Sequence, residues 1–319
     1  MDILLWSAYA VIILMLMLAG VTFSILFERK VIGAIQLRPG PNRHGPWGLF
    51  QTVADVLKLL LKEDIVPKGA DRVIFLIAPV IAFAPAFAVY SVIAFDENIY
   101  GADLNIGVLY LLGVSSITML GVLMGGWSSN NKYSLLGSIR GVAQMVSYEL
   151  PLVLSVVGIV ILVGSLNMRE IVMYQESMGM WFIVPQFLAF GVYIISSIAE
   201  LNRSPFDLPE AESELVSGYF TEYSGFRYAM YMLAEYTYAI AIAAIATMLF
   251  LGGWAGPDFL PGVVWFLLKM AAFMFLWFWF TATLPRARVD GLMNFGWKVL
   301  IPLAILNIVV TAFIKVWMG

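Results

Sequence analysis

The chain has 319 residues, of which 61% are hydrophobic and 12% charged, and its mean hydropathy is +0.90. Soluble domains carry roughly 25% charged residues, so this composition excludes a soluble globular protein and indicates a polytopic membrane protein. Cysteine is absent from the sequence, which excludes disulfides and cysteine-ligated zinc or iron–sulfur clusters. With a single histidine, a metal site would need carboxylates alone, and we expect none.

The hydropathy pattern predicts an all-α fold of about eight transmembrane helices that form one integral membrane domain over 1–319. A helix needs about 20 predominantly apolar residues to cross a membrane. The first apolar run follows an acidic residue, where a signal peptide needs basic ones, so we expect it to be an uncleaved span. The predicted spans cover 3–27, 73–95, 107–126, 142–164, 181–199, 229–251, 263–284 and 299–318.

The connection 28–72 between the first two spans is predicted to contain an amphipathic helix. Its stretch "RPGPNRHGPWG" is rich in proline and glycine and indicates turns. Residues 47–63 then show helical periodicity, which is typical of a helix that lies in the membrane interface. Such a helix either anchors the loop or frames an opening for a lipid-soluble molecule. The apolar face holds Leu49, Val53, Val56, Leu57 and Leu60, and the polar face holds Gln51, Asp55, Lys58 and Lys62.

Two carboxylates fall inside predicted spans. Glu149 lies within the fourth span, in "VSYELP", and Glu235 within the sixth, in "MLAEYTY". An Asp in the middle of a span costs about 2.5–3.5 kcal/mol on insertion scales, so an intramembrane acid is a candidate functional group. Each is also consistent with a structural hydrogen bond to a neighbouring helix. Glu28, at the end of the first span, is typical of a solvated helix-end charge, and Lys269 is expected to extend to the membrane surface.

The segment "AELNRSPFDLPEAESELVSGYFTEYSG" (199–225) concentrates negative charge in an otherwise apolar chain. It holds six carboxylates and one cation, Arg203. Neighbouring carboxylates and desolvation both raise the pKa of an acid, so such a cluster can hold and pass protons near neutral pH. With the two intramembrane acids, the segment predicts a proton path from loop to membrane. The six carboxylates are Glu200, Asp207, Glu210, Glu212, Glu214 and Glu222.

Fifteen of the 18 Lys and Arg residues fall in four connections, 28–72, 127–141, 200–228 and 285–298. The positive-inside rule places these connections in the cytoplasm and both termini outside. The opposite loops are short, so we expect contacts with soluble partners on the cytoplasmic side. The three remaining cations are Arg169, Lys269 and Lys315.

Two long segments carry a resemblance to a known family. "ERKVIGAIQLRPGPNRHGPWGLFQTVADVLKLLLKED" (28–64) and the acidic segment 199–225 resemble the hallmark segments of the H subunit of proton-pumping NADH:quinone oxidoreductase, respiratory complex I. "VSYELP", "MLAEY" and "LPRARVDGLMNFGWKVLIPLAILN" fit the same family, so the resemblance covers nearly the whole chain. One departure is that the common "RYDQLM" reads "RVDGLM" here.

The resemblance implies an eight-span subunit of the bacterial inner membrane, with a quinone-access channel between the first span, the amphipathic helix and the sixth span. It implies ubiquinone or menaquinone as substrate, with NADH, FMN and the iron–sulfur clusters held by partner subunits, and no catalytic residue or metal ligand in this chain. It also implies docking onto the hydrophilic subunits and the small membrane subunits of the complex. The implied quinone-channel residues are Glu28, Arg29, Asp55, Lys58, Arg286 and Arg288, and the implied proton-path residues are Glu149, Glu200, Glu210, Glu212, Glu214 and Glu235.

Three alternative functions stay open on the sequence. Two are close: the homologous membrane anchor of an energy-converting hydrogenase, and the same subunit in a complex fed by ferredoxin. The third, a free-standing secondary transporter, belongs to another class and more often shows inverted repeats and paired broken helices at the midplane. Neither feature is evident in this sequence, and the loops on one side are elaborated as docking requires.

Overall fold

The computed structural model describes residues 2–210, 212–257 and 259–318, and the regular structure in these ranges is helical apart from one isolated bridge between Ala94 and Tyr100. Seven of the described helical segments are long and apolar enough to cross a membrane, and the shorter apolar helix α7 accompanies them. The all-α polytopic fold expected from hydropathy is therefore confirmed. The segments long enough to span are α1 (Asp2–Ile35), α3 (Arg72–Ala88), α4 (Gly107–Ser128), α5 (Lys132–Val163), α9 (Gly225–Phe250), α10 (Gly262–Thr283), and α11 (Val289–Phe295) with α12 (Ile301–Met318). The shorter helices are α2 (Gln51–Leu61), α6 (Met168–Met178), α7 (Phe187–Glu200) and α8 (Glu212–Leu215).

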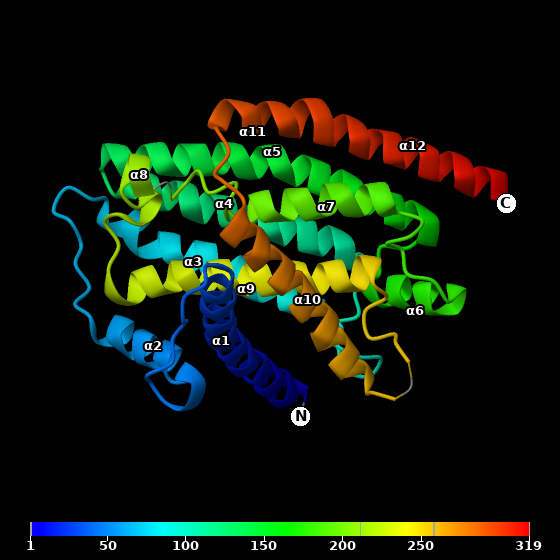
Figure 1. The fold of residues 1–319 in the computed structure, drawn as a ribbon, viewed down its shortest axis with the longest axis horizontal. Helices are drawn as coiled ribbons and strands as arrows, with labels where there is room; N and C mark the ends of the chain where they lie inside the picture. The colour runs from blue at the N-terminus through cyan, green and yellow to red at the C-terminus, as the bar shows by residue number, and fades with distance from the viewer. Residues whose placement is uncertain (1, 211, 258, 319) are drawn as a thin grey trace.

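The central span is α9, which packs against α3, α10, α1 and α2, while α5 packs against α4, α7 and α12. Figure 1 shows α3, α4, α5, α7 and α9 running roughly side by side, with α1 and α10 crossing them at an angle. Helices α2 and α8 lie at one end of the bundle and α6 at the other. We call the first the basic end, because the connections 36–71, 129–131, 201–224 and 284–288 lie there, and the second the α6 end.

The fifth predicted span, 181–199, is shorter than expected. Its helix α7 covers Phe187–Glu200, 14 residues. At about 1.5 Å per residue this is about 21 Å, which falls short of the roughly 30 Å hydrocarbon core. Residues 181–186 form turns instead, and their backbone amides bond to the Gln175 side chain and the Phe250 carbonyl. Protein acceptors of this kind let the chain leave a helix where water cannot satisfy the backbone.

The connection predicted over 127–141 is mostly helix, because α5 begins at Lys132, where the Asn131 side chain caps it. The 32 residues of α5 correspond to about 48 Å, well above the roughly 30 Å of the hydrocarbon core. The helix is therefore longer than a span requires, and its first turns lie at the basic end. A hydropathy pattern cannot distinguish such a turn from a loop, because both carry charges such as Arg140.

Helix α1 continues to Ile35, beyond the predicted end of the first span at residue 27. Glu28 is only 8% exposed and pairs with Arg203 from a distant part of the chain. The interpretation of Glu28 as a solvated helix-end charge is therefore wrong. Because the acid is paired inside the protein, the helix passes this point without presenting a charge to lipid.

The amphipathic helix predicted over 47–63 is confirmed as α2, which one turn of 3₁₀ helix precedes. Its polar side faces α1, where Asp55 pairs with Arg29. Its apolar side is exposed, with Leu57 and Leu60 each about half accessible (53% and 51%). This orientation suits a helix whose apolar face meets lipid or a lipid-soluble ligand.

Two lysines near the α6 end donate to backbone carbonyls, Lys269 from a buried position and Lys315 from an exposed one. Lys269 of α10 is 7% exposed, so the expectation that it extends to the membrane surface is wrong. Its ammonium instead satisfies carbonyls in the turn that directly follows α9, where a positive charge also complements the dipole of that helix. Lys315 of α12 donates to carbonyls in the last turn of α5. The acceptors are Leu251, Gly253 and Ala255 for Lys269, at 2.6, 2.9 and 2.6 Å, and Ile161 and Leu162 for Lys315, at 2.5 and 3.1 Å.

Single cysteines should report the sidedness of the two ends, because the chain has none of its own. Glu63 and Glu176 are exposed side chains at the basic end and the α6 end. The positive-inside rule predicts that Glu63→Cys reacts with a membrane-impermeant maleimide only from the cytoplasm and Glu176→Cys only from outside. Labelling of both from one side would contradict this topology.

Candidate functional site

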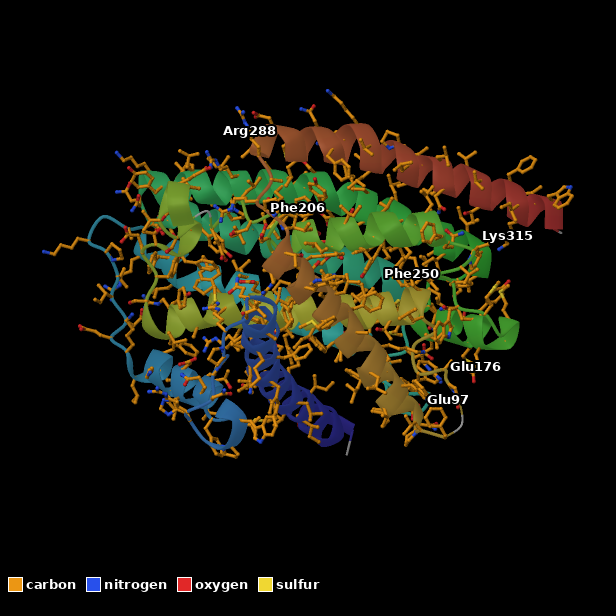
Figure 2. All side chains as sticks on the ribbon, viewed as in Figure 1. Glu97, Glu176, Phe206, Phe250, Arg288 and Lys315 are labelled. Atoms are coloured by element: carbon orange, nitrogen blue, oxygen red, sulfur yellow. The ribbon has the colours of Figure 1, made fainter. Side chains whose placement is uncertain are left out.

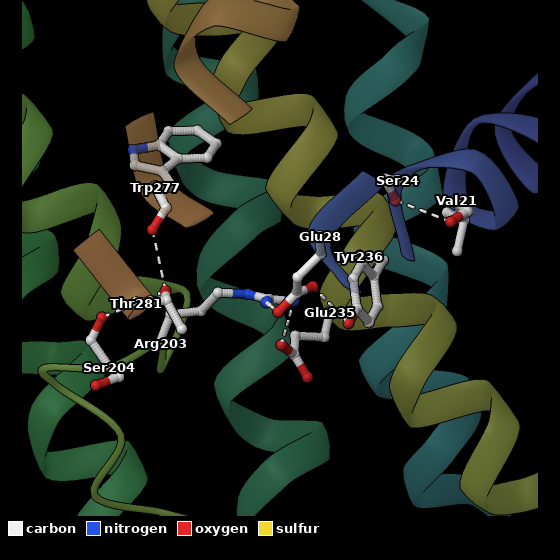
Figure 3. Close-up of polar contacts among 9 residues, drawn as sticks. All are labelled: Val21, Ser24, Glu28, Arg203, Ser204, Glu235, Tyr236, Trp277 and Thr281. Atoms are coloured by element: carbon white, nitrogen blue, oxygen red, sulfur yellow. Dashed lines mark hydrogen bonds and ion pairs between the residues drawn. The ribbon is translucent and has the colours of Figure 1, made fainter. Parts of the chain in front are cut away.

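A buried arginine joins α1 to α9 near the basic end. Arg203 follows Asn202, whose left-handed backbone (φ 52°) is a conformation that asparagine tolerates, in the turn after α7. Past this turn, one guanidinium nitrogen donates to Glu28 of α1, and the other lies 2.9 Å from a carboxylate oxygen of Glu235 in α9. Figure 3 shows the Arg203 side chain reaching the two carboxylates.

Two aromatic rings complete the surroundings of this guanidinium. The Tyr236 hydroxyl donates to the second oxygen of Glu28 at 2.7 Å. The Arg203 guanidinium lies 4.6 Å from the centroid of the Tyr236 ring and 5.6 Å from that of Phe278. Cation–π contacts gain strength when they are desolvated, as they are here. Ion pairs and ring contacts together hold a cation inside the bundle.

Arg203 keeps its proton in this environment, although it is only 7% exposed. Burial alone lowers the pKa of the guanidinium, but the charges of Glu28 and Glu235 outweigh burial and raise that pKa well above its ordinary value. One guanidinium thus shares its positive charge between two carboxyl groups. A further charge brought near either acid therefore changes how the guanidinium divides its interaction between them.

Glu235 also lines an internal cavity of about 40 Å³, and Glu200 at the end of α7 lines the same cavity. One water needs about 10–15 Å³ of such space, so the cavity has room for about two or three. Polar groups around it can hold water by hydrogen bonds. The other polar residues of the lining are Thr118, Asn202, Tyr219, Tyr231 and Tyr238.

Glu149 continues this series of acids into α5. It is half-buried and close enough for its charge to act on Glu200. Glu200 is 4% exposed and accepts a hydrogen bond from the Tyr238 hydroxyl of α9. The structure thus brings three predicted acids into a series that leads from α9 through the end of α7 to α5.

The contact between α1 and α2 gathers further predicted residues. Asp55 of α2 accepts from Arg29 at 2.5 Å and from Gln51 at 3.0 Å. Arg29 directly follows Glu28 in α1, so this contact lies next to the ion pairs that Arg203 makes with Glu28 and Glu235. Lys58 lies about one turn beyond Asp55 on α2 and is exposed. Four of the six predicted quinone-channel residues therefore lie in one region.

The acidic loop, residues 201–224 between α7 and α9, packs onto α5. It lies next to the cavity that Glu200 and Glu235 line, which we call the polar cavity. Gly218 adopts a left-handed backbone (φ 53°), and a Cβ at this position would lie 1.7 Å from the Pro209 carbonyl oxygen. The following residue, Tyr219, is buried, and both this burial and the charge of Glu210 raise the pKa of its hydroxyl. Because Tyr219 lines the cavity, it connects Glu210 with the acids inside the bundle.

Two further loop acids pair with arginines at the basic end. Glu214 pairs with Arg140 at 2.7 Å and remains 58% exposed, and Asp207 pairs with Arg286 at 2.7 Å. Glu212 begins α8, and its side chain lies outside the described set. The structure therefore gives contacts for the predicted proton-path residues Glu210 and Glu214, but it describes none for Glu212.

The two predicted channel arginines near α11 lie apart from the contact between α1 and α2. Arg288 pairs with Asp290 at 3.2 Å, and both side chains are exposed. Arg286 and Arg288 border a hollow of about 350 Å³ together with Arg140 and Glu214. Figure 2 shows Arg288 on the side of the bundle opposite α2. These two arginines belong to the border of the acidic loop and not to the Arg29–Asp55 contact.

Several residues of the site are not assigned a role by the sequence. In the sequence, Arg203 stands out only because it is the one cation in a segment with six carboxylates. This is the one signal that could have pointed to its role. Gln144 donates to the carbonyls of Ala199 and Phe206, each at 2.6 Å, and so holds the acidic segment on α5. Neither Gln144 nor Tyr238 has a signal of its own, because buried amides and tyrosines are ordinary in such helices.

Comparison with known proteins agrees with the sequence resemblance. The family model described as NADH dehydrogenase matches residues 8–312. A protein of Brevibacillus brevis, named as the H subunit of NADH-quinone oxidoreductase, is 59% identical over 315 residues, which cover 97% of this chain and 93% of its own. Proteins of the same name from Bacillus cytotoxicus and Bacillus thuringiensis are each 59% identical over 310 residues, covering 96% of this chain and 92% of theirs. The chain therefore belongs to the NADH dehydrogenase family, as its segments 28–64 and 199–225 predict.

Proposed function

We propose that the chain is the H subunit of a proton-pumping NADH:quinone oxidoreductase. Its relatives carry that name at 59% identity across almost their whole length. The protein works only within the complex, where hydrophilic partner subunits hold NADH, FMN and the iron–sulfur clusters, and ubiquinone or menaquinone is the substrate. It lies in the bacterial inner membrane with the basic end in the cytoplasm and both termini outside.

The quinone channel in this proposal lies between α1, α2 and α9. Helix α2 packs on both α1 and α9. Its exposed Leu57 and Leu60 offer an apolar wall for the quinone tail, and Arg29, Asp55 and Lys58 form a polar border for the head group. Arg286 and Arg288 contribute from the other side of the basic end, where a docked hydrophilic subunit closes the space between.

One observation carries the coupling part of the proposal: Arg203 pairs with Glu28 on one side and Glu235 on the other. Glu28 belongs to the proposed quinone channel, and Glu235 lines the cavity shared with Glu200. A charge change at the channel therefore reaches the acid series through a single guanidinium. Such interactions are strong in a protein interior, because the effective dielectric constant of about 20 is far below that of water.

Quinone reduction supplies this charge change, because the reduced ring takes up protons from its surroundings. When the charge near Glu28 changes, the strength of the ion pair between Arg203 and Glu235 changes with it. Glu235 then binds or releases a proton. Water in the shared cavity then passes the proton between Glu235 and Glu200, and Glu149 hands it to the neighbouring membrane subunit. Mutual repulsion among Glu210, Glu212 and Glu214 makes the loop a responsive proton source.

Glu235→Gln tests this function, because it keeps the shape of the side chain and removes its charge. In the purified and reconstituted complex, we expect quinone reductase activity and proton pumping to fall together by about tenfold or more, which corresponds to about 1.4 kcal/mol of lost coupling. Reduction of ferricyanide by the electron donor should stay unchanged, because electrons enter through partner subunits.

The control for this experiment is Glu176→Gln, which removes an exposed carboxylate at the α6 end and should leave all three activities intact. Full pumping in the Glu235→Gln complex would contradict the proposed proton path. The subunit composition of the same preparation separates the alternatives. A hydrogenase anchor would copurify with a catalytic hydrogenase protein, a ferredoxin-fed complex would lack the NADH-binding subunit, and a transporter would be isolated alone.

A further inference from the structure

Two internal cavities meet at Tyr238. The first is the polar cavity that Glu200 and Glu235 line. The second is a cavity of about 30 Å³ whose lining is almost entirely apolar, including Leu111, Val156 and Leu249. Tyr238 is the one described residue that lines both. Its side chain therefore stands at the boundary between them.

The polar cavity contains groups that need a ligand. One carboxylate oxygen of Glu200, Oε2, and the hydroxyl of Thr118 are buried without a hydrogen-bond partner among the described residues. Both residues line this cavity and are at least nine-tenths buried, with 4% and 8% exposure. A buried polar atom without a partner is costly, and water satisfies such atoms where the space allows. The polar cavity beside these two residues has room for water.

The apolar cavity continues away from the basic end. Val108 near the start of α4 and Met168 at the start of α6 both line it, so it reaches the α6 end of the bundle. Apolar cavities of this size stay dry, because a water inside would lack hydrogen-bond partners. Joined to the polar cavity, however, it would extend the space available to water toward the α6 end.

Tyr238 makes the contacts that prevent this joining. Its hydroxyl donates to Glu200 Oε1, which leaves Oε2 without a partner among the described residues. The hydroxyl also interacts with Ser115 on the apolar side. Tyr238 is 6% exposed, and it borders both cavities.

We propose that Tyr238 is a positioning residue that orients Glu200 toward the polar cavity and seals this cavity from the apolar one. Water and protons then pass between Glu235 and Glu200, and they do not continue to the α6 end. The consequence for pumping rests on the proposed function, whereas the partition itself does not. The ring and the hydroxyl have separable tasks, since the ring seals and the hydroxyl orients.

Two variants of the reconstituted complex separate these tasks. Tyr238→Ala opens the partition, so the passive proton conductance of the liposomes should rise severalfold in the absence of electron donor. Tyr238→Phe keeps the ring, so the conductance should stay low. Its quinone reductase activity should fall about tenfold, because a hydrogen bond to a charged group is lost. A cryo-EM map of Tyr238→Phe should show the Glu200 carboxylate rotated from its present position.

Tyr193→Ala is the matched control, because Tyr193 is a buried tyrosine that lines only the apolar cavity. It enlarges that cavity without opening the polar one, and its conductance should match the unmodified complex. Low conductance in Tyr238→Ala, with Glu200 unmoved in Tyr238→Phe, would overturn the partition whatever Glu235→Gln shows. A leak in Tyr238→Ala would support the partition even if Glu235→Gln pumps normally, in which case only the proposed function fails.

Discussion

A complex that carries Arg203→Leu is expected to assemble in lower yield and to lose quinone reductase activity and pumping by at least about tenfold, or about 1.4 kcal/mol in coupling. The substitution leaves Glu28 and Glu235 buried without their shared cation, and removal of one partner from a buried ion pair typically costs about 3–5 kcal/mol. Activity assays on reconstituted complex and thermal inactivation measure the two effects separately. Arg203→Lys should recover only part of the activity, because an ammonium lacks the planar fork that reaches two carboxylates.

Arg169→Leu is the matched control for this experiment. Arg169 also pairs with a carboxylate, that of Asp103 at 2.9 Å, but it does so at the α6 end. We expect its loss to leave quinone turnover unchanged. The double variant Arg203→Leu/Glu28→Gln should lose less stability than the two single effects predict, because one of the unpaired charges is gone. Full quinone turnover in assembled Arg203→Leu complex would refute the link through the guanidinium.

Gly218→Ala is expected to detach the acidic loop from α5 and to reduce quinone reductase activity to a small fraction. An alanine here costs about 1–2 kcal/mol for its left-handed backbone alone. Its Cβ would also lie 1.7 Å from the Pro209 carbonyl oxygen, and a backbone atom cannot move aside as a side chain can. Gly137 of α5 packs on the same point, where a Cβ on Gly137 would lie 2.8 Å from the Gly218 Cα, so no space is left for compensation.

The control for Gly218→Ala is Gly191→Ala in α7. A Cβ at Gly191 would meet nothing within 4 Å, and alanine favours a helix by about 1 kcal/mol over glycine. This variant should be as stable as the unmodified complex or more so. Limited proteolysis of the loop and quinone reductase assays on both variants provide the comparison. A protected loop with full activity in Gly218→Ala would show that the close approach to Pro209 is not needed.

Hydropathy and charge predict most of the fold because a membrane imposes one length and one polarity on every span. They are least informative where protein replaces lipid or water as the environment. Helix α7 is short because Gln175 and Phe250 supply acceptors to the turns before it, and such partners are distant in sequence. The first turns of α5 carry cations and still belong to the helix, because α5 is longer than a span requires.

The candidate site is predictable only in its parts. The intramembrane acids stand out because an unpaired charge in a span is costly, and the carboxylates of the loop stand out by their density. Which of them meet is a property of the packed bundle. Glu28 and Arg203 are 175 positions apart in sequence, and no periodicity relates them. The resemblance assigns Glu28 and Glu235 to different tasks, whereas the structure places both on one arginine.

The lysine on α10 has a consequence for the turn that follows α9 near the α6 end. Lys269 lies seven residues after the first residue of α10, or about 10 Å along that helix. The carbonyls it holds belong to the turn that directly follows α9. The Lys269 ammonium is buried away from water, and it supplies the hydrogen bonds that water would otherwise give to three peptide carbonyls. Because this amine is covalently attached to the protein, the turn that follows α9 keeps its hydrogen-bond partner whatever the surrounding solvent contains.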